Sequence, residues 1–243
     1  MKLYNQILQK KNGIAVLLDP DKFENQDIDS LIEKANFASI DYFFIGGSTG
    51  TQDQTKKLVS LVKAKSTIPV ILFPGSSEQI SNEADGILLL NLISGRNPDF
   101  LIGHHINAAE TLDKSTIEIL STSYVLIDGG NASSVSYISQ TTPIPRNQLS
   151  IIRKTVLAGE QIGHRICFLD AGSGAITPIS KEIIETVRKT ISNPLIVGGG
   201  IRSIDDIKTA FENGANLVVI GNQIEENIDF LLDIHSFQSQ FNR

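Results

Sequence analysis

The chain has 243 residues, of which 41% are hydrophobic and 20% charged, and its formal net charge is −6. This acidic balance argues against a nucleic-acid-binding protein, which needs a basic face, and the single cysteine excludes a disulfide framework within the chain. The sequence has neither a signal-peptide pattern nor a run long enough to cross a bilayer, so we expect a cytoplasmic protein without an integral membrane segment.

Eight short apolar runs, most of them separated by segments with helical spacing, predict a repeating strand–helix pattern. Runs without polar alternation are typical of parallel strands that are covered on both faces, and eight of them favour a closed barrel. We therefore predict an α/β fold, a single (β/α)8 TIM-type barrel domain over residues 1–243. The expected strands are residues 14–18, 42–45, 70–73, 86–90, 124–127, 166–169, 195–197 and 217–220.

Two connections depart from an ideal barrel. Residues 74–85 are few and rich in Gly, Ser and Glu, so we predict a barrel modified after the third strand, without room for a full helix. The connection 128–165 is long. Its polar first half, 131–145, is interpreted either as a mobile surface loop or as a lid, and its second half, 148–163, is predicted to be a helix.

Functional groups in such barrels lie at the carboxyl ends of the strands. Asp19 follows the first predicted strand, where a carboxylate is costly to bury unless it is paired or metal-bound. It could hold Mg²⁺, or it could cap the Asp-Pro turn that follows. Gly46, Gly47 and Ser48 end the second strand and could form an anion-binding nest or supply an oxygen near the metal.

Glycine-rich loops follow the last three predicted strands, at residues 168–174, 198–200 and 221–222. Glycine lets a ligand approach the backbone N–H groups closely, and loops after strands 7 and 8 of a barrel commonly bind phosphate. Asp170 lies beside this predicted cradle, where it could act as a base on a hydroxyl of the phosphorylated substrate; a β-turn with a capping Asp is the alternative. By contrast, the adjacent His104 and His105 point to different helix faces, so we expect no metal pair there.

Taken together, these loops resemble the geranylgeranylglyceryl phosphate synthases and their bacterial heptaprenylglyceryl phosphate relatives. The resemblance runs through most of the chain, and the surroundings of residues 128–131 and 142–145 are similar to an archaeal and Bacteroidetes-type branch. It rests on Leu18-Asp-Pro-Asp-Lys22, Gly46-Gly-Ser48, Phe168-Leu-Asp-Ala-Gly-Ser-Gly174, Gly198-Gly-Gly200 and Gly221-Asn222.

The resemblance implies a prenyltransferase of ether-lipid and phospholipid biosynthesis. The C3 hydroxyl of sn-glycerol 1-phosphate would attack C1 of a polyprenyl diphosphate, with geranylgeranyl diphosphate favoured, and diphosphate would leave. Asp19 and Ser48 would bind Mg²⁺, and Asp170 would be the catalytic residue that accepts the hydroxyl proton. The residues implied in binding glycerol phosphate are Phe168, Leu169, Asp170, Ala171, Gly172, Ser173, Gly174, Gly199, Gly200, Gly221 and Asn222.

Two departures from the family pattern bear on this site. Many relatives have Tyr-Leu-Glu where this chain has residues 168–170 as Phe-Leu-Asp, so the carboxylate is shorter and no phenol is available at that position. Many also have a Lys at the position of Leu17, a phosphate contact that Lys22 or Arg202 would have to replace. The resemblance further implies a prenyl groove lined in part by residues 88–112, a homo-oligomer and transient contact with a membrane surface.

Other functions fit parts of the pattern. Another phosphate-binding barrel enzyme, of the sugar-phosphate isomerase or thiazole or thiamine phosphate synthase type, would explain the last two loops equally well. It would not explain the first and sixth loops together. A non-catalytic phosphometabolite sensor is the remaining alternative. The acidic pair Glu225-Glu226 is expected to be solvated helix surface.

Overall fold

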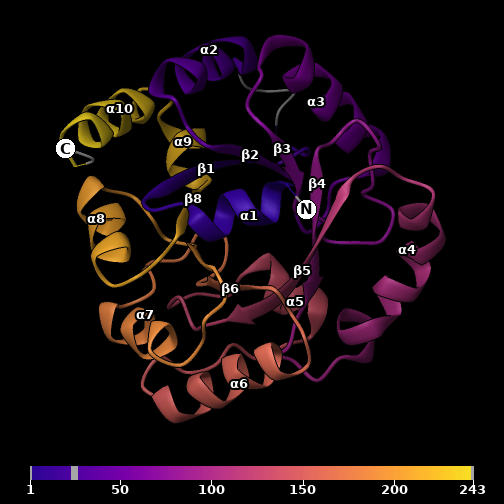
Figure 1. Cartoon of the computed structure of the whole chain (residues 1–243), viewed down its shortest axis with the longest axis vertical. Coiled ribbons are helices and arrows are strands. Elements are labelled where there is room, and N and C mark those ends of the chain that lie inside the picture. Colours follow the sequence, from indigo (N-terminus) through magenta and orange to yellow (C-terminus); the bar gives the residue numbers. More distant parts are fainter. Residues whose placement is uncertain (1, 23–26, 242–243) are drawn as a thin grey trace.

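The computed structural model describes residues 2–22 and 27–241. In this part of the chain, parallel strands pair in sequence order and the last pairs with the first, which closes a barrel of eight strands (Figure 1). The predicted barrel is confirmed. The strands are β1 (Gly13–Leu18), β2 (Tyr42–Ile45), β3 (Val70–Leu72), β4 (Gly86–Asn91), β5 (Glu118–Leu126), β6 (Ile166–Asp170), β7 (Leu195–Gly198) and β8 (Leu217–Ile220).

Helices form a ring around the barrel (Figure 1). Their apolar faces pack on the outward side chains of the strands in one continuous cluster, as expected for a parallel sheet covered by its crossover helices. They are α2 (Ile28–Ala38), α3 (Gln52–Lys65), α4 (His104–Asp113), α6 (Leu149–Gln161), α7 (Lys181–Arg188), α8 (Ile204–Glu212), α9 (Asn222–Glu226) and α10 (Phe230–Phe241), with a π-helical turn, η2 (Asp99–Gly103), before α4. Within the described residues, no helix is long and apolar enough to cross a bilayer.

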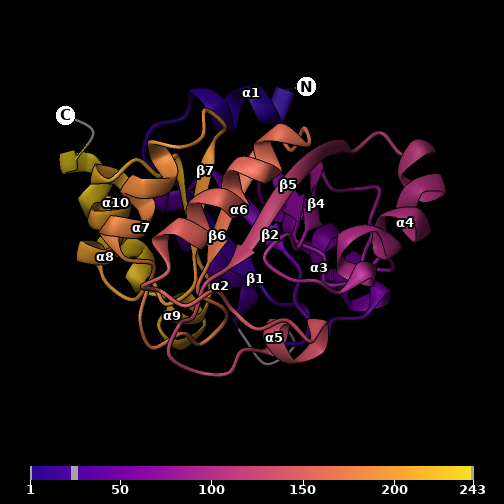
Figure 2. The ribbon, with the colours of Figure 1, turned by 90° about the horizontal axis from the view of Figure 1, so that it is seen from below.

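One end of the barrel is covered by α1 (Lys2–Gln9). Figure 1 shows this helix across the centre of the ring, and Figure 2 places it at the end opposite α5 (Ser134–Ser139). Leu3 and Ile7 on α1 are buried in the cluster that fills the barrel interior. Because α1 covers this end, the carboxyl ends of the strands form the opening that remains for a ligand.

The structure corrects the sequence-based prediction for some helices and strands and confirms it for others. The segment 131–145 contains α5, a short helix that begins with a Ser133–Ser136 capping box, so it is not an irregular loop throughout. β5 begins at Glu118, six residues before the predicted start, because its polar residues 121–123 find hydrogen-bond partners. As predicted, no helix lies within residues 73–85, all of which are described, and α6 fills the second half of the long connection.

Replacing Ile7 by Ala should destabilise the protein by about 3 kcal/mol, since deleting a fully buried side chain loses its transfer free energy and leaves a cavity. Ile7 has no exposed surface, whereas the adjacent Leu8 is 42% exposed. Leu8→Ala is therefore the control, with an expected change of about 0.5 kcal/mol or less. Urea unfolding of both variants measures the two free energies; equal losses would show that α1 is not an integral part of the core.

Candidate active site

A polar pocket opens at the carboxyl ends of β1, β2, β6, β7 and β8. Its charged lining consists of the carboxylates Asp19, Asp21, Asp170 and Glu225 and the cations Lys22 and Arg202. Carboxylates therefore outnumber cations in a pocket that the sequence predicts to bind phosphate. A phosphate bound there needs either backbone N–H donors or a metal ion to offset this negative charge.

Asp170, the last residue of β6, is the most buried of these carboxylates. Its Oδ1 accepts the N–H of Gly172 at 2.8 Å, and its Oδ2 accepts the hydroxyl of Tyr124. Burial raises the pKa of Asp170 above the ordinary value of 3.8, while the hydrogen bonds from Tyr124 and Gly172 oppose that rise. A carboxylate with a raised pKa is a better proton acceptor than an ordinary Asp.

Tyr124 is a site residue that the sequence analysis did not identify. It lies in β5, next to Phe168 in the ladder with β6, and its ring meets the Phe168 ring edge to face at 5.6 Å between centroids. The phenol that is missing at position 168 is thus supplied from the neighbouring strand. Its place in a predicted apolar run was the only signal in the sequence, and that signal does not distinguish a core Tyr from a functional one.

Consecutive glycines after β7 form a turn at the polar pocket, where the sequence predicts a phosphate cradle. Gly199 and Gly200 have φ values of 81° and 71°, in the left-handed region that favours glycine. Their N–H groups, and that of Ser173, have no acceptor among the described residues. Unpaired N–H groups in such a turn form a concave site for phosphate. At Gly199 a Cβ atom would lie 2.5 Å from Oδ1 of Asp170, so only glycine lets the cradle and the carboxylate adjoin.

Asp19 and Ser48 both line the polar pocket, at the ends of β1 and β2. Burial raises the pKa of Asp19, and the N–H of Asp21, which donates to Oδ1 at 3.1 Å, opposes that rise. Asp19 therefore caps its turn, as one of the two interpretations of the sequence predicted. Gly47 is packed against this carboxylate, since a Cβ atom there would lie 2.8 Å from Oδ1.

The predicted phosphate-site residues do not all reach the pocket. The predicted residues that line it are Phe168, Asp170, Ser173, Gly174, Gly199, Gly200, Gly221 and Asn222. Leu169 and Ala171 are instead buried in the cluster between the barrel and the helices. Gly172 uses its N–H on Asp170, so it acts on that carboxylate and has no N–H left for phosphate.

Glu225 differs from the expectation that it lies on a solvated helix surface. Its side chain is only 16% exposed, lines the polar pocket and accepts the ammonium of Lys22 at 2.7 Å. The neighbouring Glu226 is exposed as predicted. Lys22 and Arg202, the two cations considered as replacements for the missing lysine, both line the pocket, and Lys22 is ion-paired there with Glu225.

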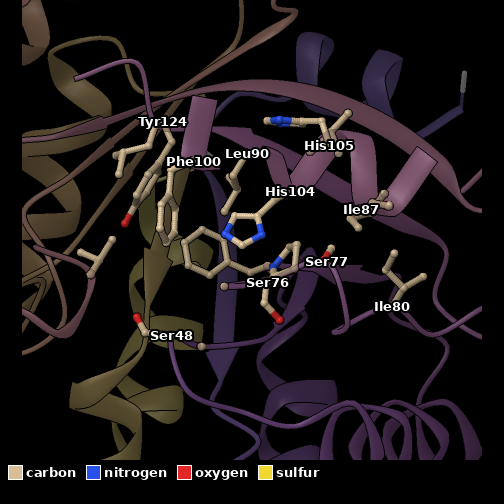
Figure 3. A pocket seen from close by; sticks show the side chains of 18 residues that line it. Ser48, Ser76, Ser77, Ile80, Ile87, Leu90, Phe100, His104, His105 and Tyr124 are labelled. Atoms are coloured by element: carbon tan, nitrogen blue, oxygen red, sulfur yellow. The ribbon is translucent and has the colours of Figure 1, made fainter. Parts of the chain in front are cut away.

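A second, apolar pocket adjoins the polar one. It is lined mainly by Phe73, Ile80, Ile87, Leu89, Leu90, Leu92, Phe100 and Ala108, with His104 and His105 on α4. In Figure 3, Ser48 and Tyr124 lie on one side of it and Ile80 and Ile87 on the opposite side. Part of the predicted groove segment 88–112 forms its wall.

The two histidines are wall residues of this apolar pocket. His104 contacts Phe100 edge to face at 4.8 Å between ring centroids. Burial lowers the pKa of His105, and its interaction with the Leu90 backbone opposes that fall. Among the described residues, no cluster of three or more His, Cys, Asp or Glu side chains could hold a metal ion.

Comparisons with known proteins agree on one family. The family model described as the PcrB family matches residues 5–237. The chain is 48% identical over 215 residues to the geranylgeranylglyceryl phosphate synthase of Zunongwangia profunda. The matched residues cover 88% of this chain and 92% of that protein. It is 38% identical over 220 residues to the synthase of Thermococcus gammatolerans, covering 90% and 86% respectively.

A solved structure of an enzyme of the same name is also similar to this chain. The (S)-3-O-geranylgeranylglyceryl phosphate synthase from Thermoplasma acidophilum, in complex with its substrate sn-glycerol-1-phosphate, superposes with a TM-score of 0.88 at 28% identity. The superposition covers 98% of this chain and 96% of that one.

Replacing Gly199 by Ala should weaken the binding of inorganic phosphate about tenfold or more, because the new Cβ atom would collide with Asp170. Gly163→Ala is the matched control: it also places Ala at a positive φ, of 94°, but in open space. Both variants carry the same kind of backbone strain. Calorimetric titration with phosphate that shows equal affinities for the two variants would place the anion site elsewhere.

Proposed function

The chain belongs to the PcrB family, and we infer from this membership and from the two adjoining pockets that it is a geranylgeranylglyceryl phosphate synthase. It transfers a prenyl group from a prenyl diphosphate to sn-glycerol 1-phosphate and forms an ether bond. The single observation that carries this function is that the polar and apolar pockets share the wall residues Gly47, Ser48, Phe73, Tyr124 and Val135. A substrate with an anionic head and an apolar tail fits such a junction.

Glycerol phosphate is proposed to bind with its phosphate on the N–H groups of Ser173, Gly199 and Gly200, and Arg202 adds positive charge beside them. The C3 hydroxyl then faces Asp170. In the transfer, the C3 oxygen forms a bond to C1 of the prenyl group, the bond from C1 to the diphosphate oxygen breaks, and the hydroxyl proton passes to Asp170. The raised pKa of this carboxyl suits that role, and Tyr124 holds its Oδ2 in place.

The prenyl tail is proposed to occupy the apolar pocket between β4, η2 and α4. Each buried CH₂ group contributes about 0.8 kcal/mol, so the length of the tail strongly affects affinity. Geranylgeranyl diphosphate remains the favoured donor. The apolar pocket is limited in size by its wall residues Phe100, Ile80, Ile87 and Ala108. A pocket of limited length favours one prenyl tail length over longer ones.

Two residues of the polar pocket, Asp19 and Ser48, fit a Mg²⁺ ion. Asp19 and Ser48 offer hard oxygen ligands, and Mg²⁺ takes few protein ligands and completes its octahedron with water and substrate phosphate oxygens. Asp19 is also partly desolvated and has Asp21 and Glu225 as acidic neighbours. Asp19 and Ser48 would hold the ion, which when bound supplies positive charge for the departing diphosphate. The homo-oligomer, the membrane-surface contact and the cytoplasmic location stay predictions from the sequence.

The alternatives explain less of the site. A sugar-phosphate isomerase or a thiamine phosphate synthase has no use for an apolar pocket that shares a wall with the polar one. A non-catalytic phosphate sensor would need the cradle but not the buried carboxylate of Asp170 with its Tyr124 partner.

The direct test is to incubate the protein with Mg²⁺, geranylgeranyl diphosphate and each glycerol phosphate enantiomer separately. Prenyl ether is expected from sn-glycerol 1-phosphate alone, and chelating the metal should stop its formation. Asp170→Asn should lower kcat about 100-fold or more while phosphate binding persists. An absence of product with both enantiomers, across short and long prenyl diphosphates, would refute the synthase.

Replacing Tyr124 by Phe should move the acidic limb of the rate–pH profile to higher pH. The hydroxyl stabilises the ionised form of Asp170 and lowers its pKa, so its removal raises that pKa, and the base is lost at a higher pH as the solution is acidified. Tyr42→Phe is the control, because this Tyr is buried in the barrel interior on β2. An unchanged acidic limb in Tyr124→Phe would mean that another group carries the proton.

A further inference from the structure

A chain of hydrogen bonds crosses the rim of the polar pocket and links the loops after β1, β6 and β8. The ammonium of Lys22 lies 2.7 Å from Oε2 of Glu225. The same carboxylate oxygen accepts Nδ2 of Asn222 at 3.2 Å. On its other side, Oδ1 of Asn222 accepts the N–H of Gly174 at 2.8 Å and the hydroxyl of Ser173 at 3.3 Å.

The carboxylate of Glu225 and the N–H of Gly174 together determine the orientation of the Asn222 amide. An ionised carboxylate can only accept hydrogen bonds, and a backbone N–H can only donate. The amide must therefore turn its NH₂ group to Glu225 and its oxygen to Gly174. The reversed amide would set oxygen against oxygen at one end and donor against donor at the other, so both contacts would be lost.

This orientation fixes the loop that carries the proposed catalytic groups. Gly174 and Ser173 follow Asp170 by only a few residues, and the N–H of Ser173 is one of the unpaired donors of the phosphate cradle. Gly174 has a φ of 72°, and a Cβ atom there would meet little more than the Asn131 side chain at 3.7 Å. Side-chain packing therefore does little to hold this turn, and two side-chain amides hold it instead: Asn222 accepts the N–H of Gly174, and Nδ2 of Asn131 donates to the Gly174 carbonyl at 3.1 Å.

We propose that Glu225 is a positioning residue of the transfer reaction, which acts through Asn222 to preform the glycerol phosphate site. The proposal rests on the proposed function for the identity of the substrate. Lys22 holds the carboxylate from the β1 side, Glu225 orients Asn222, and Asn222 holds the β6 loop in the form that presents its donors to phosphate. None of these steps requires Glu225 to touch substrate or metal.

Simple electrostatics predicts the opposite effect of removing this charge. Glu225 is a negative group beside a pocket that accepts a phosphate and a diphosphate, so neutralising it should tighten anion binding if charge alone mattered. Positioning predicts weaker binding, because a Gln at 225 can both donate and accept. The reversed Asn222 amide then keeps a contact with residue 225 and loses only the one to Gly174, so the native orientation is less strongly favoured. The apparent affinity for phosphate is then lowered in proportion to the fraction of molecules in which the amide has the competent orientation.

In the test, Glu225→Gln is compared with Glu226→Gln, which removes an equal charge from an exposed neighbour. We expect Glu225→Gln to raise the KM for sn-glycerol 1-phosphate about tenfold with kcat changed less than threefold, and Glu226→Gln to behave as the native chain. Equal melting temperatures of the two variants establish that the effect is not general destabilisation. An unchanged or lowered KM in Glu225→Gln would overturn the proposal.

The route through Asn222 is tested in a double-mutant cycle. In an Asn222→Ala background, Glu225→Gln should have no further effect on KM, whereas an effect of the full size there would overturn the proposal. The cycle is repeated by calorimetry with inorganic phosphate and no prenyl diphosphate. This second readout decides the role of Glu225 even in a protein that forms no ether product, and so separates this proposal from the proposed function.

Discussion

The parallel pairing of β8 with β1 is the constraint on which the rest of the site depends. It closes the barrel, and closure brings the carboxyl ends of all strands to one rim. Lys22 and Glu225 are 203 residues apart in sequence, yet they form an ion pair across this seam. With α1 covering the opposite end, the rim is where a polar pocket and an apolar pocket can share a wall.

At this rim, burying the carboxylate of Asp170 costs free energy of folding. Removing a carboxylate from water is unfavourable unless hydrogen bonds compensate, and here the Tyr124 hydroxyl and the Gly172 N–H do so. The same burial raises the pKa of Asp170 and so makes it a stronger base. This arrangement requires glycine at position 199, because any side chain there would displace the Asp170 carboxylate.

Much of the fold and part of the site could be predicted from the sequence. Short apolar runs located the strands to within a few residues, except for the polar start of β5, and strand ends located Asp19 and Asp170. The contact of Tyr124 with Asp170 joins residues 46 positions apart and depends on strand register, which no local pattern encodes. Glu225 had the sequence context of a solvated helix, and only barrel closure shows that it faces the pocket.

The central claim is that one rim holds the phosphate of glycerol phosphate on the β6 and β7 loops and its free hydroxyl at Asp170. A crystal structure of this protein with sn-glycerol 1-phosphate tests the claim most directly. We predict phosphate oxygens on the N–H groups of Ser173, Gly199 and Gly200, and the C3 hydroxyl within about 3 Å of the Asp170 carboxylate. A phosphate bound away from these groups, or a C3 hydroxyl turned away from Asp170, would contradict the account.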